Sequence, residues 1–162
     1  MSTHSLHRTQ MIPRPVEEVW TFFSAPSNLA LITPPDMGFE VLSEPQGPEI
    51  YPGQLIEYRG KPLLGIPVYW MTEITQVERL QYFIDEQRFG PYRFWYHQHH
   101  FQETTKGTEM TDIVHYRNPL GFIGDWADQL FVKQRLRKIF DFRLKKVEEV
   151  LGRVSRLLRH RT

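Results

Sequence analysis

The residues with the most scope for chemistry are three histidines in one short segment, His97, His99 and His100. Successive side chains of a β-strand point to opposite faces of the sheet, so His97 and His99 share one face and His100 lies on the other. Trp95 lies on the face of the first two, and we expect it to point into the core. Both histidines are then buried, where an imidazole serves as a general base, a hydrogen-bonding group or a metal ligand.

Asp112 is the carboxylate expected to lie beside these histidines. It alternates with Met110 and Tyr116 on the more apolar face of the following extended segment. An unpaired buried carboxylate is costly, so Asp112 needs a histidine on the neighbouring strand or an arginine of the C-terminal helix, such as Arg135 or Arg143. Two interpretations stay open: a polar end of an apolar pocket that fixes the head of a ligand, or a structural pair that holds the sheet to the helix.

Asp85 offers a second carboxylate, on the same strand face as Phe83 and Gln87. It belongs either to a polar patch at the rim or on the inside of a pocket, or to a structural bond with Arg93 or a helix residue. The sequence leaves both interpretations open.

Metal binding and acid–base catalysis are the two kinds of chemistry that these groups could perform. Residues two apart on a strand are separated by about 7 Å and can converge on one ion. Because His100 faces away, His97, His99 and Asp112 give three ligands at most, and the sequence predicts neither a metal nor a cofactor. In an enzyme, His97 or His99 would act as the general base, oriented by Asp112, for proton abstraction and dehydration. The sequence has no nucleophile elbow, phosphate-binding glycine loop or dinucleotide fingerprint.

Length and composition limit the class of protein that carries these residues. A chain of 162 residues predicts one domain, spanning 1–162, and a composition that is 40% hydrophobic and 14% aromatic excludes wholesale disorder. A formal net charge of +1 gives no global electrostatic footprint for nucleic acid. The absence of cysteine excludes disulfides and thiolate chemistry. Residues 1–9 lack the apolar core of a signal peptide, so we expect a cytoplasmic protein.

Changes in periodicity mark the elements that must position the histidines. Short loops between successive strands favour antiparallel pairing. After the first strand, Pro15 and the apolar spacing that follows predict a helix over 16–24, and a second short helical piece is expected over 27–31. Strands are predicted where β-branched and aromatic residues concentrate, at 5–12, 39–42, 54–58, 68–75, 81–87, 92–103 and 108–116.

The C-terminal part of the chain predicts one long amphipathic helix from about residue 125, because apolar residues recur every three or four positions. Continued to residue 159 it would be roughly 50 Å long, so we expect it to fray or protrude beyond Gly152. A sheet with one apolar face needs a cover, and this helix is the only large element available. The sequence therefore predicts an α+β helix-grip fold, a curved antiparallel sheet of about seven strands, in the order strand, two helices, six strands, helix, wrapped around the long C-terminal helix.

Five strings of the sequence carry a family resemblance. They are FIDEQ at 83–87, GPYRFWYHQH at 90–99, GTEMTD at 107–112, PLG at 119–121 and IFDFR at 139–143. In these strings the chain resembles the START/Bet v 1-like (SRPBCC) superfamily, which includes START lipid-transfer domains, Bet v 1 pollen allergens and aromatic polyketide cyclases. Within it, the sequence is most similar to a bacterial group of small ligand-binding domains labelled cell-division-inhibitor-like, which also occurs joined to nucleotide-sugar-epimerase-like domains. The resemblance implies a helix-grip fold with a cavity.

The sequence favours a binding protein over an enzyme. We expect a small hydrophobic molecule, a lipid, an isoprenoid or an aromatic metabolite, to lie between the sheet and the C-terminal helix, against mostly apolar walls with a few polar groups. A cyclase or dehydratase that uses His97, His99 and Asp112, and an interaction protein with a filled core, are the alternatives. The predicted ligand-binding residues are Trp70, Phe83, Asp85, Trp95, His97, His99, Phe101, Met110, Asp112, Tyr116, Phe131, Arg135 and Ile139.

Loops and the C-terminus suggest further contacts. Segments 47–53, 60–67 and 118–125 are predicted to form the mouth of the cavity. The basic end, 153–162, is interpreted as a solvated helix end or tail, with transient membrane-surface contact through it or through the loops as the alternative. The apolar loop residues that would plug the mouth or touch a partner or membrane are Leu63, Leu64, Ile66, Phe122 and Ile123.

Overall fold

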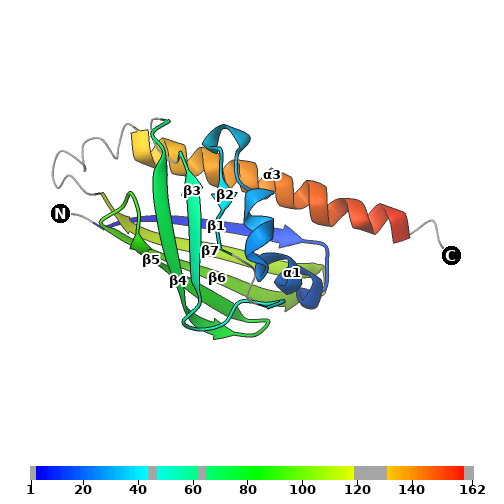
Figure 1. Ribbon diagram of the computed structural model, residues 1–162. Coiled ribbons are helices and arrows are strands. Elements are labelled where there is room, and N and C mark those ends of the chain that lie inside the picture. The colour runs from blue at the N-terminus through cyan, green and yellow to red at the C-terminus, as the bar shows by residue number, and fades with distance from the viewer. Residues whose placement is uncertain (1–2, 44–46, 62–64, 119–130, 159–162) are drawn as a thin grey trace.

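The computed structural model describes residues 3–43, 47–61, 65–118 and 131–158 of the chain, and for 153–158 it describes the helical backbone alone. Within these residues an antiparallel sheet of seven strands curves around one long helix (Figure 1). The predicted α+β helix-grip architecture is confirmed.

All seven predicted strands are present, with small differences at their ends. The strand order is β1-β7-β6-β5-β4-β3-β2, and every neighbouring pair is antiparallel. The sheet is thus a meander closed by the first strand, which returns to pair with the last. The strands are β1 His4–Ile12, β2 Glu40–Val41, β3 Leu55–Gly60, β4 Val68–Glu78, β5 Tyr82–Phe89, β6 Phe94–Thr104 and β7 Gly107–Arg117.

Two irregularities between β4 and β5 bend the sheet. The pairing register shifts between Met71 and Thr72 and again between Ile74 and Gln76. Such bulges increase local twist, which turns β3 and β4 across the ends of the other strands (Figure 1). The concave face that results is the face on which α3 lies.

Short helices connect β1 to β2. Helix α1, Val16–Phe23, follows Pro15 and carries Glu17 and Glu18 in its first turn, where the helix dipole favours acids. The second predicted helical piece is a 3₁₀ helix, η1 (Pro26–Ala30), and a further 3₁₀ turn, η2 (Pro35–Met37), follows it. These proline-rich turns lead the chain across the concave side of the sheet, beside α3 (Figure 1).

The long helix α3, Lys133–Leu158, covers the sheet. Its predicted start near 125 lies outside the described residues. Its C-terminal end projects past the sheet, as expected from its length (Figure 1). None of the helices in the described ranges has an apolar stretch long enough to cross a bilayer.

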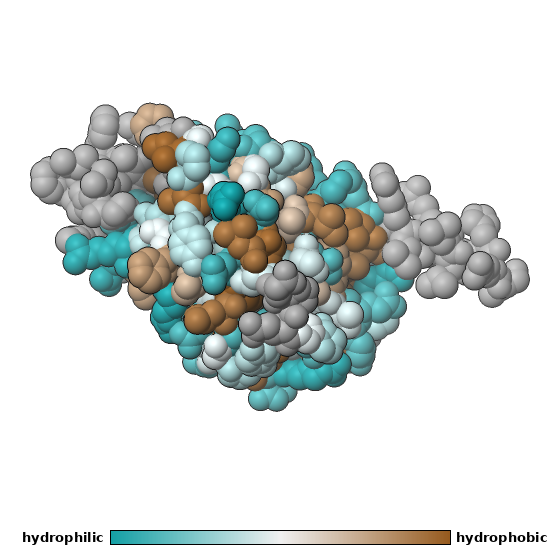
Figure 2. All heavy atoms as spheres, viewed as in Figure 1, coloured by the Kyte–Doolittle hydropathy of each residue, from teal (hydrophilic) through white to brown (hydrophobic). Residues whose placement is uncertain are grey.

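Alternating burial along β6 and β7 defines the inner face of the sheet. Trp95, His97 and His99 on β6 are buried, and so are Met110 and Asp112 on β7. One apolar core cluster surrounds Trp20 of α1 and another lies under the start of α3. On the surface, apolar residues form several small groups among polar ones on the face seen in Figure 2.

Candidate functional site

Strands β5, β6 and β7 bring four titratable side chains together, and we name them the histidine–aspartate cluster: Asp85, His97, His99 and Asp112. In the register of the sheet, Asp85 pairs with His97 and His99 pairs with Asp112. All four side chains lie on the inner face. The expectation that His97, His99 and Asp112 lie together inside the protein agrees with this geometry, and Asp85 joins them there.

Each imidazole in the cluster lies between two carboxylates. Hydrogen bonds join His97 Nε2 to Asp112 Oδ1 at 2.9 Å and His99 Nε2 to Asp85 Oδ2 at 3.0 Å. His99 Nδ1 lies 3.0 Å from Asp112 Oδ1, and His97 Nδ1 lies 3.4 Å from Asp85 Oδ2. These last two contacts are within ion-pairing distance but are not aligned as hydrogen bonds. The two rings have centroids only 3.8 Å apart.

Burial and mutual charge set the protonation of the cluster. Burial raises the pKa of Asp112, but the hydrogen bond from His97 and the close contact with His99 outweigh it and hold that pKa well below its usual range. Burial also raises the pKa of Asp85, and the charge of His97 and the bond from His99 reverse the effect. Both carboxylates are therefore ionised near neutral pH.

The pKa values of the two histidines shift in opposite directions. Burial lowers the pKa of His97, and the charge of His99 lowers it further. Burial also acts to lower the pKa of His99, but its close contact with Asp112 and its hydrogen bond to Asp85 outweigh burial and raise that pKa. Arg143, whose Nη1 lies 3.9 Å from Asp112 Oδ1, adds a positive charge beside the cluster.

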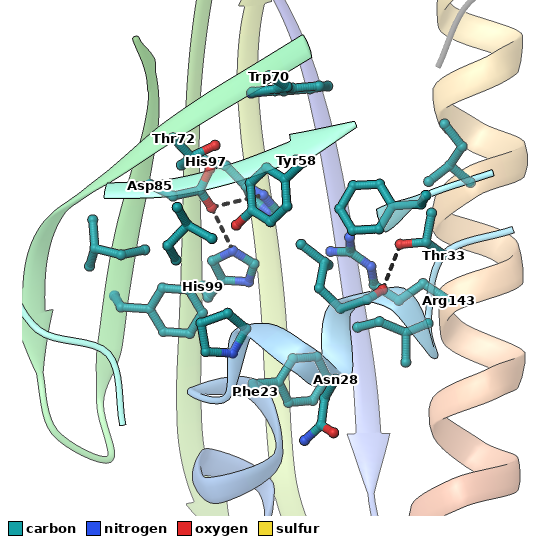
Figure 3. A pocket seen from close by; sticks show the side chains of 18 of the residues that line it. Phe23, Asn28, Thr33, Tyr58, Trp70, Thr72, Asp85, His97, His99 and Arg143 are labelled. Atoms are coloured by element: carbon teal, nitrogen blue, oxygen red, sulfur yellow. Dashed lines mark hydrogen bonds and ion pairs between the residues drawn. The ribbon is translucent and has the colours of Figure 1, made fainter. Parts of the chain in front are cut away.

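The cluster forms part of the wall of a cavity of about 140 Å³. Asp85, His97 and His99 line this cavity, whereas Asp112 lies behind them and lines a small separate hollow with Arg143. Figure 3 shows the three lining groups on the sheet side and Arg143 on the helix side. The remaining walls are mostly apolar and include Phe22, Phe23, Leu29, Ile32, Met37, Ile56, Trp70, Ile74, Phe83, Trp95, Leu136, Ile139 and Phe140.

Three polar groups of the lining can donate hydrogen bonds. The Nε1 of Trp70 and the Nε of Arg143 are buried and have no hydrogen-bond partner among the residues that the structure describes. Tyr58 turns its hydroxyl toward Asp85 and His97 (Figure 3). Burial and the nearby charge of Asp85 raise the pKa of Tyr58, so this hydroxyl keeps its proton.

The structure places seven of the thirteen predicted ligand-binding residues at the cavity. They are Trp70, Phe83, Asp85, Trp95, His97, His99 and Ile139. Phe101 and Met110 instead belong to the core cluster around Trp20, and Tyr116 to the other core cluster. Asp112 reaches the cavity only through the histidines. Ligand contact at each of these residues stays a prediction.

Two of the predicted residues, Phe131 and Arg135, lie away from the described lining of the cavity. Phe131 is 57% exposed and lies outside the cavity. Arg135 forms an ion pair with Asp36, with 2.8 Å between Nη1 and Oδ2, and not with Asp112. Arg143 takes the position near Asp112 that the sequence offered to either arginine.

Sequence reasoning missed the part of the cavity wall that is formed by the segment from the end of α1 to η2. Phe22, Phe23, Leu29, Ile32 and Met37 come from this segment, and most of the half-buried lining residues lie in it. The available signal was a run of apolar residues between prolines, which predicted helical turns but not their packing.

The loops predicted to form the mouth contribute little to the described lining of the cavity. Of 47–53, Ile50 lines the cavity, and the described residues of 60–67 do not. Ile66 is 59% exposed. Leu63, Leu64, Phe122 and Ile123 lie outside the described residues, as do the side chains of the basic segment 153–162.

Comparisons with solved structures give strong matches to the whole fold. Protein Ms6760 from Mycobacterium smegmatis matches with a TM-score of 0.68 and 17% identity, covering 95% of this chain and 98% of that chain. The Bet v 1-like Ara h 8.0201 matches with a TM-score of 0.59 and 14% identity over 91% and 99% of the two chains. The nucleoside-diphosphate sugar epimerase from Corynebacterium glutamicum matches with a TM-score of 0.63 and 23% identity, over 93% of this chain but 30% of the epimerase.

Sequence comparisons add no nearer relative. No protein-family model matches the chain, and no curated protein matches it. At identities this low, structural likeness speaks for architecture and not for activity. The chain therefore shares the fold of the Bet v 1-like proteins and of several bacterial proteins of the same architecture.

Proposed function

We propose that the protein binds a small, largely apolar molecule in the cavity between the sheet and α3, with an oxygen acceptor of that molecule held by the polar lining. The observation that carries the proposal is a mostly apolar cavity whose wall includes Trp70 and Arg143, residues whose Nε1 and Nε atoms are buried and have no hydrogen-bond partner among the described residues. Mostly apolar walls with a few converging polar groups are typical of ligand sites. A buried donor without an acceptor costs about 1–3 kcal/mol, which a ligand acceptor would recover.

The volume of the cavity favours one of the ligand classes considered from the sequence. At about 140 Å³ the cavity is close to the engineered apolar cavity of about 150 Å³ that accommodates benzene in another protein. A compact aromatic molecule with one polar substituent fits this size. A lipid or an extended isoprenoid would require the α1–η2 segment to move away from the sheet.

The alternative functions are less well supported. As a general base, His97 or His99 would need a free nitrogen lone pair toward a substrate, but all four ring nitrogens lie within 3.4 Å of a carboxylate oxygen. A protein with a filled core would lack a cavity of this size. Ligand binding without turnover is therefore the function that the site supports best.

The test combines a ligand screen with a variant that fills the cavity. Native mass spectrometry of the purified protein, and thermal shifts with a panel of substituted benzenes, should reveal ligands bound at one per chain. Ile139→Phe, whose side chain faces the cavity, should abolish this binding. Leu55→Phe is the matched control because Leu55 is 47% exposed and outside the lining. Binding that survives Ile139→Phe in a folded protein would contradict the proposal, and so would the absence of any ligand in both assays.

A further inference from the structure

The histidine–aspartate cluster has more contacts than its protons can satisfy. Four nitrogen–oxygen contacts join His97 and His99 to the two carboxylates, at distances from 2.9 to 3.4 Å. Four N–H donors would exist only if both rings carried a positive charge. Two buried imidazolium rings with centroids 3.8 Å apart would repel each other strongly. With fewer protons, a ring nitrogen presents its lone pair to a carboxylate oxygen, which is unfavourable.

The longest contact shows where this lone pair lies. His97 Nε2 makes the 2.9 Å hydrogen bond to Asp112, so a neutral His97 carries its proton there. His97 Nδ1 then directs its lone pair at Asp85 Oδ2, 3.4 Å away, without a hydrogen bond. His99 Nε2 is hydrogen-bonded to the same oxygen at 3.0 Å. Two imidazole nitrogens thus face one carboxylate oxygen in the wall of the cavity.

A metal ion bound among these three atoms would take the place of the proton between His99 Nε2 and Asp85 and would accept the lone pair of His97 Nδ1. One ligand atom each from Asp85, His97 and His99 lies within 4.8 Å of the others. Ligands bound at about 2.1 Å, with angles between about 90° and 109°, are about 3.0–3.4 Å apart. The separations of Asp85 Oδ2 from the two nitrogens, 3.0 and 3.4 Å, fall in that range.

Asp112 is placed to orient both imidazoles. Its Oδ1 lies 2.9 Å from His97 Nε2 and 3.0 Å from His99 Nδ1, on the side of the rings away from Asp85. If both of these nitrogens carry protons, the opposite nitrogens present lone pairs to an ion, the arrangement by which carboxylates commonly support histidine ligands. Asp112 does not line the cavity, whereas the other three groups do. The cavity side is thus left for a further ligand.

We propose that Asp85, His97 and His99 form a binding site for one divalent first-row transition-metal ion such as Zn²⁺, oriented by Asp112 and open toward the cavity. Two imidazoles and one carboxylate are a donor set that suits Zn²⁺ and Fe²⁺. The sequence analysis predicted no metal because it counted three ligands at most, and it took Asp112 as the third. The register of β5 and β6 supplies Asp85 instead. This site does not depend on the proposed function, because an ion can bind whether or not a molecule occupies the cavity.

Zinc binding is measured by isothermal titration calorimetry on the full chain after removal of metals with EDTA. We expect one equivalent to bind to the wild type. Asp85→Asn and His97→Gln, which nearly preserve shape, should remove stoichiometric binding, and Asp112→Asn should weaken it by about 10- to 100-fold. His100→Gln is the matched control, because His100 lies on the opposite face of β6 and bonds Gln98. No binding to the wild type, or unchanged binding in Asp85→Asn and His97→Gln, would overturn the proposal.

A second measurement needs no variant. With Co²⁺ in place of Zn²⁺, proton NMR of the wild type should show two hyperfine-shifted, slowly exchanging imidazole N–H signals, from His97 and His99 hydrogen-bonded to Asp112. Their absence from a Co²⁺-saturated protein would refute the site. Ligand screens run in EDTA test the proposed function separately, so either proposal can fail alone.

Discussion

Replacing Asp112 by asparagine tests the electrostatic account of the cluster. The change keeps the size of the side chain but removes the negative charge that faces His97, His99 and Arg143. The side chain of Asp112 is 10% exposed, so solvent cannot replace that charge. Breaking a buried ion pair by removing one partner costs about 3–5 kcal/mol. Because asparagine still offers an oxygen to His97, we expect a loss of about 2–3 kcal/mol in the free energy of unfolding.

The expected loss is large enough to measure directly. For a domain of this length, 1 kcal/mol corresponds to about 2–4 °C, so the melting temperature should fall by about 4–12 °C at pH 7. Calorimetry and urea unfolding followed by tryptophan fluorescence, both in EDTA so that no metal contributes, give the two values. Asp141→Asn is the matched control, because Asp141 pairs with Arg8 but is 60% exposed, and it should change stability by less than about 0.5 kcal/mol.

The pH dependence of the stabilities of wild type and Asp112→Asn tests the direction of the pKa shift of Asp112. The pKa of Asp112 is lowered in the folded state from 3.8, so its contribution is fully present above that value and is lost as the pH falls through the folded-state pKa. The stabilities of wild type and Asp112→Asn should therefore converge in acid. Two results would refute the reasoning. One is a loss of stability in Asp112→Asn at pH 7 that is as small as the loss in Asp141→Asn. The other is a stability difference between wild type and Asp112→Asn that stays the same when the pH falls below the usual range of carboxyl pKa values.

Three further changes have defined outcomes. Trp70→Phe keeps an aromatic ring but removes the indole N–H that has no partner among the described residues, so calorimetric titration should show a larger loss of affinity for ligands that carry an oxygen acceptor than for purely apolar ones. Gly107→Ala should destabilise at least about 2 kcal/mol more than Gly53→Ala in urea unfolding, because both glycines have positive φ but only at Gly107 would a Cβ meet the carbonyl oxygen of Ile12. Phe131→Ala should leave ligand affinity within about twofold of wild type in the same titration, because Phe131 is exposed and outside the cavity, and a larger loss would place it at the site.

Strand periodicity was sufficient to predict the inner face of the sheet. Trp95 and Met110 fixed the orientation of β6 and β7, and alternation then placed His97 and Asp112 inside, where they are 4% and 7% exposed. The period of a strand is two residues, so one inward residue determines the others. Asp85 was harder to place, because its partner depends on the register of β5 against β6, which the spacing of apolar residues does not encode.

The rotation of α3 explains the position of Arg135. It precedes by eight positions Arg143, which does line the cavity, whereas Phe131 lies before α3 begins. Eight residues correspond to about 80° around a helix of 3.6 residues per turn, so Arg135 and Arg143 lie on adjoining faces. A broad apolar stripe does not distinguish these faces. The packing of buried residues such as Val147 against the sheet decides between them.

The pairing of the first strand with the last has a consequence for the order of folding. His4 pairs with Tyr116 and Ile12 with Thr108, whereas β3 to β7 each pair with a neighbour in the chain. During synthesis β1 emerges from the ribosome before β7, so its hydrogen bonds to β7 cannot all form until Arg117 has emerged. The local hairpins, and with them the junction of Asp85, His97, His99 and Asp112, can assemble before this long loop closes. The N-terminal strand can thus be the last to join the sheet, and the histidine–aspartate cluster inside the protein can be in place before β1 pairs with β7.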